Sequence, residues 1–148
     1  MDRVSKAKQY MSERQSNCSQ SVFRVYAEQL GLDEKQALMI AQGFGGGMGH
    51  TGGVCGAVTG AYMALGLANP ASLENPRQSV DKTYGLVAEF ERRFKKKHGS
   101  VYCTELLNYD LTKPEQVAKA REAGVFTSKC PQFVADAVSI TDELLNIR

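Results

Sequence analysis

The sequence predicts an all-α fold, a single-domain multi-helix bundle with a glycine-rich loop before a central buried helix. Three observations lead to this prediction. Apolar residues recur at helical spacing in several segments, and capping residues or Gly and Pro stops separate those segments. No stretch has the sustained alternation or the β-branched runs of a strand. The 148 residues, 43% of them hydrophobic, suffice for one core, so residues 1–148 are assigned to a single helical domain.

The ends of the predicted helices are marked by specific residues. Asn17 and Asn75 are good N-cap residues, and Pro76 suits the first turn of the longest helix. Asn69-Pro70 ends the most apolar segment, because the residue before a proline avoids the helical region. In chain order, the expected helices cover about residues 4–11, 17–30, 33–43, 54–68, 75–99, 101–107, 114–124 and 130–145.

Two helices carry apolar or small-residue patterns that predict how they pack. The longest helix has one apolar stripe, which we expect in the core. The stripe consists of Val80, Tyr84, Val87, Phe90 and Phe94. The central helix has Gly56, Gly60 and Ala64 on one face at intervals of four, so a neighbouring helix can pack against it at short distance.

Charge and hydropathy exclude some partners. The net charge of +2 is too small to indicate nucleic acid, and the one basic cluster, residues 92–97, closes a predicted helix as a solvated last turn. The longest apolar run, residues 54–68, is shorter than the roughly 20 residues that span a bilayer, so no membrane insertion is expected. Residues 1–15 are polar and lack the apolar region of a signal peptide, so we expect a cytoplasmic location.

The four cysteines are dispersed along the chain at Cys18, Cys55, Cys103 and Cys130. No Cys-x-x-Cys pair occurs, which excludes a zinc knuckle, a thioredoxin-type pair and a c-type haem attachment site. The predicted helices nevertheless put each cysteine in or just before the first turn of a different helix. Unpaired N–H groups there stabilise a thiolate, the form that binds metals and attacks disulfides. All four are candidate metal ligands, and the alternative is four buried cysteines that pack as small hydrophobes.

A glycine-rich loop leads directly into Cys55. Residues 43–53 hold seven glycines in eleven residues, and glycine lets backbone N–H groups approach an anion closely. Residues 47–52 also match the G-x-G-x-x-G fingerprint, but a dinucleotide site requires a preceding strand, which this sequence does not predict. The candidate cofactor-binding backbone is that of Gly45, Gly46, Gly47 and Gly49.

The two histidines have different prospects. His50 lies in the loop five residues before Cys55, where it could serve as a metal ligand or as a base that activates the thiol. His98 follows the basic run at the end of the longest helix. A surface position that complements the helix dipole is expected for it.

Short motifs around the cysteines resemble those of the C_GCAxxG_C_C family of redox-active proteins. The resemblance extends from about Cys18 to Leu145. One departure is the order Cys55-Gly56-Ala57, where the family label has Gly-Cys-Ala. The motifs read Asn17-Cys18-Ser19-Gln20-Ser21-Val22, Gly45-Gly46-Gly47-Met48-Gly49, Cys55-Gly56-Ala57-Val58-Thr59-Gly60-Ala61, Met63-Ala64-Leu65-Gly66-Leu67, Cys103-Thr104-Glu105-Leu106-Leu107, Tyr109-Asp110-Leu111 and Cys130-Pro131-Gln132-Phe133-Val134.

The resemblance implies a small helical protein with four family cysteines, associated with an oxidoreductase or transport-system partner. Three hypotheses follow for the chemistry. The thiolates could hold an iron-sulfur cluster or a soft metal such as zinc, because tetrathiolate ligation suits both. Cys55 could instead be the nucleophile of a thiol-disulfide redox protein. The third hypothesis is a non-catalytic accessory protein with structural cysteines.

Cys55 is also expected to be the most reactive thiol of the reduced, metal-free protein. The N-terminus of the central helix and the preceding glycine N–H groups would favour its thiolate. Burial in an apolar environment acts in the opposite direction, because it raises a thiol pKa. We expect the helix N-terminus to outweigh burial at this position.

Overall fold

The computed structural model describes residues 1–147 and confirms the all-α prediction, since no residue in that range belongs to a strand. One isolated antiparallel bridge pairs Val54 with Tyr102. The elements are α1 (Arg3–Ser12), α2 (Cys18–Ala27), α3 (Glu34–Ala41), the 3-10 helix η1 (Gln42–Phe44), α4 (Gly45–Met48), α5 (Gly56–Leu67), α6 (Pro76–His98), α7 (Cys103–Leu107), α8 (Pro114–Glu122), α9 (Val125–Ser128) and α10 (Cys130–Leu145).

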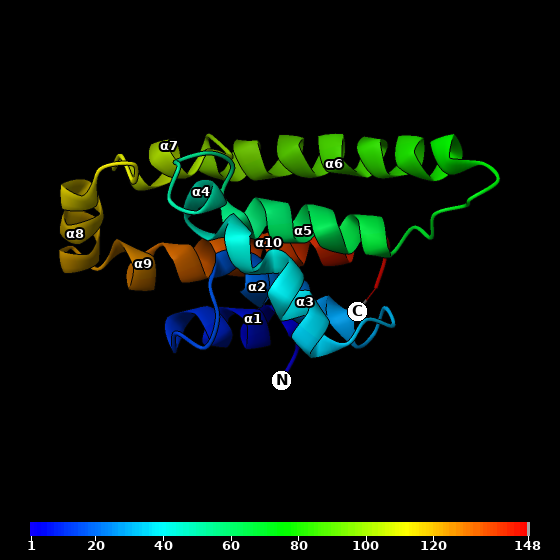
Figure 1. Cartoon of the computed structure of the whole chain (residues 1–148), viewed down its shortest axis with the longest axis horizontal. Helices are drawn as coiled ribbons and strands as arrows, with labels where there is room; N and C mark the ends of the chain where they lie inside the picture. Colours follow the sequence, from blue (N-terminus) through cyan, green and yellow to red (C-terminus); the bar gives the residue numbers. More distant parts are fainter. Residues whose placement is uncertain (148) are drawn as a thin grey trace.

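The helices form layers around the buried helices α5 and α10 (Figure 1). The long α6 runs along one side, and α1, α2 and α3 lie on the other side. α10 contacts α1, α2, α5 and α6, so its apolar residues form the centre of the core. α8 crosses one end of the molecule at a steep angle to the layers (Figure 1).

The N-termini of two early helices are fixed by side-chain caps. The Asn17 side chain accepts a hydrogen bond from Gln20 N, and the Gln20 side chain accepts one from Asn17 N, which completes a capping box. Asp33 accepts from the backbone N–H of Gln36 in the same way. Asn75 is the N-cap residue of α6, as predicted, but its side chain makes no capping hydrogen bond. Its Nδ2 donates instead to Gln78 Oε1 at 3.2 Å.

The close approach predicted for the glycine face of α5 is confirmed, and the neighbouring helix is α2. A Cβ placed on Gly60 would lie 2.6 Å from the carbonyl oxygen of Ser19. A Cβ on Gly56 would lie 2.3 Å from the sulfur of Cys18. Any larger residue at either position would push the two helices apart, so this face of α5 fixes where α2 begins.

The apolar stripe of α6 is only partly core, contrary to the expectation. Phe90 and Phe94 are fully buried, whereas Val80 is 41% and Tyr84 is 68% exposed. The first turns of α6 extend beyond the ends of α5 and α10 (Figure 1), so no other helix covers the start of the stripe. A stripe on one helix predicts an apolar face and does not say how far the partner helices reach.

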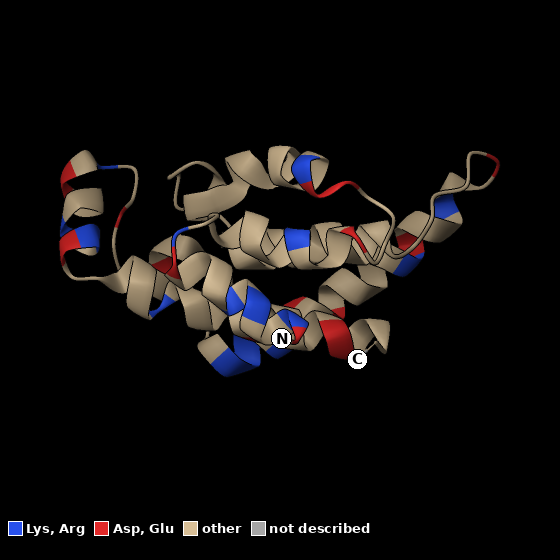
Figure 2. Cartoon of the chain, turned by 90° about the horizontal axis from the view of Figure 1, so that it is seen from below, with Lys and Arg blue, Asp and Glu red and all other residues tan. Residues whose placement is uncertain are grey.

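Charged side chains of both signs share the surface. Along α6 and α8, Lys and Arg positions lie next to Asp and Glu positions (Figure 2). Several form ion pairs within α6, such as Arg93 with Glu89 at 2.9 Å and Lys95 with Glu91 at 3.3 Å. Within residues 1–147, no helix has both the length and the apolar character needed to cross a membrane.

Candidate functional site

The structure confirms that each cysteine stands at the start of a different helix. Cys18, Cys103 and Cys130 are the first residues of α2, α7 and α10, and Cys55 is the N-cap residue of α5. All four are free thiols and buried, with 5 to 8% of each residue exposed. Positions that are far apart in the sequence therefore share one structural role.

Backbone pairing holds two of these helix starts side by side. Cys55 N donates to the carbonyl of Val101 at 2.7 Å, and Cys103 N donates to the carbonyl of Gly53 at 2.8 Å. These two bonds flank the bridge between Val54 and Tyr102. A bridge of one residue pair has no periodicity, so the sequence carried no signal for this contact.

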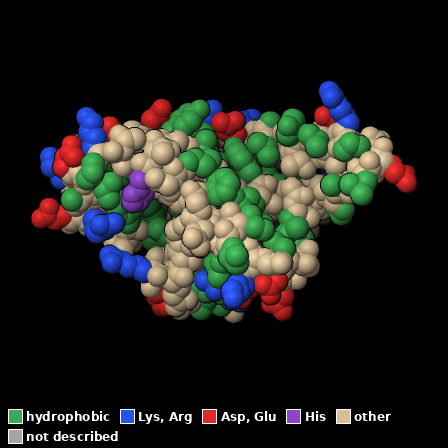
Figure 3. All heavy atoms as spheres, in the orientation of Figure 1, with side chains coloured by type: hydrophobic (Ala, Val, Ile, Leu, Met, Phe, Trp, Pro, Cys, Tyr) green, Lys and Arg blue, Asp and Glu red, His purple; other side chains and the backbone are tan. Residues whose placement is uncertain are grey.

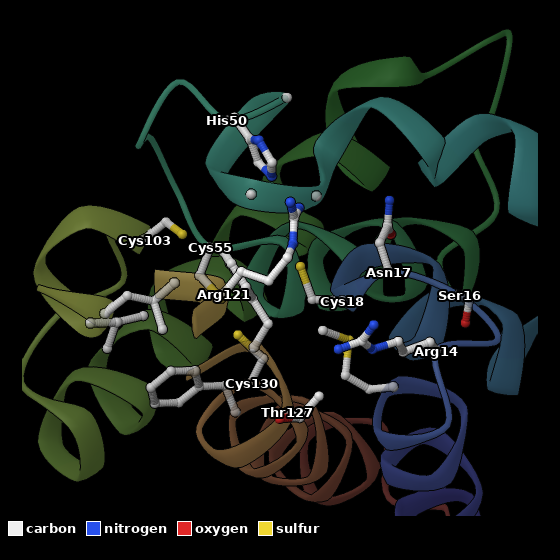
Figure 4. A pocket seen from close by; sticks show the side chains of 18 of the residues that line it. Arg14, Ser16, Asn17, Cys18, His50, Cys55, Cys103, Arg121, Thr127 and Cys130 are labelled. Atoms are coloured by element: carbon white, nitrogen blue, oxygen red, sulfur yellow. The ribbon is translucent and has the colours of Figure 1, made fainter. Parts of the chain in front are cut away.

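The four thiols line a single cavity of about 630 Å³ (Figure 4). Cys18, Cys55, Cys103 and Cys130 reach it from α2, α5, α7 and α10, and their side chains surround the same space. The wall between them is apolar and includes Leu107 and Phe133. The helix starts therefore converge on one site, as metal ligation by dispersed cysteines requires.

A single metal ion does not fit this arrangement. Among the residues that the structure describes, no three Cys, His, Asp or Glu side chains are grouped closely enough to hold an ion. A zinc site needs its four ligands about 2 Å from one point. The four thiols line one cavity instead.

Burial and mutual repulsion govern the thiol pKa values. Burial, together with the negative charge of an ionised Cys18, raises the pKa of Cys103 to about 12. Burial also raises the pKa of Cys130, again with added repulsion from Cys18 and Cys103. The thiols are thus close enough for ionisation of one to oppose ionisation of the others. Without a bound cation, Cys103 and Cys130 are protonated at neutral pH.

Cys18 has the surroundings that most favour a thiolate. Burial raises its pKa, but the backbone N–H groups of Gly46, Ser19 and Gly56 face its sulfur and oppose that rise. At Cys55, burial raises the pKa well above its usual range, thiolate charge at Cys18 adds to the rise, and only the N–H of Ala57 acts against it. The balance expected at Cys55 is therefore reversed, because the glycine N–H groups face Cys18.

Part of the predicted glycine-rich loop consists of short helical turns. Residues 42–48 form η1 and the short turn α4, in which Gly46 and Gly47 have φ values of 66° and 67°. Left-handed backbone of this kind favours glycine. A Cβ on Gly47 would also lie 2.7 Å from Cβ of Cys103. Of the candidate backbone positions, Gly45, Gly46 and Gly49 line the cavity.

His50 lies beside the thiols as expected, whereas His98 does not have the expected surface position. His50 is exposed at the cavity and its ring stacks on Phe126, with centroids 6.4 Å apart. His98 is not a surface residue. It packs between Phe94 and Phe133, and its Nε2 hydrogen-bonds Asp136 Oδ2 at 2.8 Å. His98 therefore connects the end of α6 to α10.

Sequence reasoning missed five polar residues of the cavity, which are Arg14, Ser16, Asn17, Arg121 and Thr127. Asn17, Arg14 and Arg121 all line it (Figure 4). Asn17 stands next to Cys18, so its position could have been inferred once that cysteine was a candidate. Arg14 and Arg121 lie in segments without a motif, and only the fold brings them to the thiols.

Comparison with known proteins gives a relative and a family. An uncharacterised protein of Archaeoglobus fulgidus is 30% identical over 152 residues, which cover 95% of this chain and 94% of that protein. No solved structure matches the chain. Residues 16–144 match the family described as "Putative redox-active protein (C_GCAxxG_C_C)", in agreement with the resemblance seen from Cys18 to Leu145. The chain therefore belongs to the C_GCAxxG_C_C family of redox-active proteins.

Proposed function

We propose that this redox-active protein binds an iron-sulfur cluster through Cys18, Cys55, Cys103 and Cys130. One observation carries the proposal. Four thiols from four helices line a single cavity instead of surrounding a point. Four cysteine thiolates are the usual ligands of iron-sulfur clusters, and each thiolate then binds at a separate place on a group larger than one ion.

The state of the thiols supports the same assignment. Burial and mutual repulsion raise the pKa of Cys103 and Cys130, which makes these free thiols weak nucleophiles at pH 7. Bound cations reverse the rise in pKa, because a coordinating thiol is deprotonated outright. Because the four thiolates would repel one another, their ionisation is unfavourable without a cation. A cationic group bound by all four would remove this cost.

The residues of the chain would tune such a group in recognisable ways. A bound cluster supplies one-electron transfer. The N–H groups of Gly46, Ser19 and Gly56, which face the sulfur of Cys18, would stabilise negative charge there. The buried side chains of Leu107 and Phe133 would keep water from the sulfurs.

A thiol-disulfide protein is the second candidate. The N–H groups that face Cys18 favour a thiolate at that residue, so Cys18 would attack a disulfide sooner than Cys55. The raised pKa of all four thiols counts against rapid exchange at neutral pH. This candidate needs no metal, which makes the two proposals separable.

The test is anaerobic purification followed by reconstitution with iron and sulfide. We expect iron and acid-labile sulfide in equal amounts, broad visible absorption that bleaches on reduction, and four thiols protected from alkylation. Incubation with iron alone is the control and should give no such absorption. Protein that binds no iron after reconstitution, while all four thiols remain free to titrate, would refute the cluster and leave thiol exchange as the function.

A further inference from the structure

The arginines of the chain fall into two groups. Within residues 1–147, Arg14 and Arg121 make no ion pair. All the other described arginines are ion-paired to a carboxylate. These paired residues are Arg3, Arg24, Arg77, Arg92 and Arg93. The two arginines without a carboxylate partner are the two that line the thiol cavity.

These arginines belong to a positively charged rim. Arg14, His50 and Arg121 are exposed where they line the cavity, whereas the cysteines beneath them are buried. Among the described residues that line the cavity there is no Asp or Glu. In Figure 4 the side chains of Arg14 and Arg121 project over the space that the cysteines surround. Figure 3 shows a histidine at the surface with basic side chains beside it. The charged side chains that line the opening are therefore the two arginines.

The backbone at two rim residues is of a kind that glycine adopts more readily. Arg14 has a φ of 57° at the end of α1, and His50 has a φ of 65° after α4. Gln15 N donates to the carbonyl of Tyr10 at 2.8 Å, a bond of the helix-ending turn in which glycine is the common residue. The fold alone would favour glycine at position 14, so the guanidinium itself is a reason for the arginine there.

The rim also offers apolar surface. Phe126, which stacks on His50, and Met11 are partly exposed where they line the cavity. A second hollow of about 400 Å³ adjoins the first, since both are lined by His50 and Arg121. Its other side chains are mainly apolar and include Val117. An ion without an organic part would leave this surface unused.

We propose that the rim of Arg14, His50 and Arg121 binds a small organic anion whose acidic group the two guanidinium groups hold above the thiols. The acidic group is a carboxylate, sulfonate or phosphate, because arginine binds planar or tetrahedral oxyanions through paired hydrogen bonds. The organic body lies against Phe126 and Met11. This site goes beyond the proposed cluster, since its residues are distinct from the four cysteines.

The experiment is a fluorescence titration of metal-free protein with two matched probes. Anilinonaphthalene sulfonate carries an acidic group on an aromatic body, and phenylnaphthylamine is its neutral analogue. We expect the affinity for the sulfonate to fall by about tenfold or more in R14Q/R121Q, with that for the neutral probe unchanged. R77Q, which removes an exposed arginine of α6, is the control and should leave both affinities as in the wild type.

Two further measurements locate the site. Bound sulfonate probe should slow the alkylation of Cys130 by neutral iodoacetamide in the wild type and not in R14Q/R121Q. Inorganic sulfate should compete with the probe, a result that needs no variant to fold. Equal sulfonate affinity in wild type and R14Q/R121Q, or no competition by sulfate, would overturn the proposal. Iron content after reconstitution is measured separately, so a failed cluster and a failed anion site give different results.

Discussion

The two ends of the helical bundle differ in how well local sequence describes them. At the cavity end, α2, α5, α7 and α10 begin close together, and glycines allow contacts that no larger residue permits. At the opposite end, the first turns of α6 carry the exposed residues Val80 and Tyr84. Hydrophobic side chains reach the surface toward this end in Figure 3. Neighbouring residues limit the size of side chain that is tolerated at the cavity end. At the opposite end, where α6 projects, large side chains are not limited in this way.

The largest difference is expected in thiol reactivity. With a pKa of about 12, Cys103 of metal-free protein should react with iodoacetamide on the order of a thousandfold more slowly at pH 7 than an exposed thiol. Cys18 should be labelled before Cys55, because N–H groups favour its thiolate. Mass spectrometry of partly labelled protein between pH 7 and 10 measures the order. Earlier labelling of Cys55 would restore the sequence-based expectation.

The same shifts predict a loss of stability in alkali. Thiols whose pKa is higher in the folded than in the unfolded protein stabilise the fold below about pH 8.5, the unfolded value. That contribution declines as the pH rises toward the folded pKa, which is about 12 for Cys103. Urea unfolding of metal-free protein should therefore show falling stability above about pH 8.5. The control is protein that is alkylated at its cysteines while unfolded and then refolded. Its stability should not decline above about pH 8.5.

The apolar stripe of α6 should divide into two energetic classes. Phe90→Ala should cost about 3 to 5 kcal/mol of unfolding free energy, because it removes a fully buried ring. Tyr84→Ala, six residues earlier on the same stripe, should stay within about 0.5 kcal/mol of wild type, because its side chain is exposed. Urea unfolding measures both. Similar costs at the two positions would mean that the projecting end is covered in solution.

Alanine in place of glycine should have opposite effects at the two ends. Gly60→Ala should destabilise by about 1 to 3 kcal/mol, because its Cβ would lie 2.6 Å from the Ser19 carbonyl oxygen. Gly85→Ala should stabilise by about 0.5 to 1 kcal/mol, since nothing lies within 4 Å of a Cβ there and alanine favours helix. Thermal and urea unfolding compare them. The same sign at both sites would contradict the packing described for α5.

Two asparagines before helices give the smallest contrast. Asn17→Ala should cost about 1 kcal/mol, since its side chain accepts the Gln20 N–H at the start of α2. Asn75→Ala is the matched control and should be nearly neutral, because its side chain caps no N–H of α6. If the two variants unfold at the same urea concentration, the capping box at Asn17 does not stabilise the protein as described.

The sequence predicted the helical class and the helix starts because each depends on residues a few positions apart. Caps, prolines and glycines located α2, α5, α7 and α10 closely enough to place every cysteine at a helix start. Features that depend on distant residues could not be found this way. The pairing of Val54 with Tyr102 is one such feature, and the exposure of Tyr84 is another.

The residues of the candidate site could be predicted from the sequence, but the relative pKa values of its thiols could not. Family motifs pointed to the four cysteines and to the glycine-rich segment. The sequence could not tell that the N–H groups of Gly46 and Gly56 face Cys18, because that requires the relative positions of α2, α4 and α5. Arg14 and Arg121 were missed for the same reason, since nothing near them in the chain marks a site.

The central claim is that the four thiols act as one ligand set. The most direct test is the iron content and visible spectrum of reconstituted Cys18→Ala, Cys55→Ala, Cys103→Ala and Cys130→Ala variants. Ser128→Ala, at an exposed position in α9, is the control for substitution near the site. The account predicts that each cysteine variant loses most of its iron or changes its spectrum, while the control matches the wild type. If any of the four cysteine variants keeps both the iron content and the spectrum of the wild type, that cysteine is no ligand and the claim is contradicted.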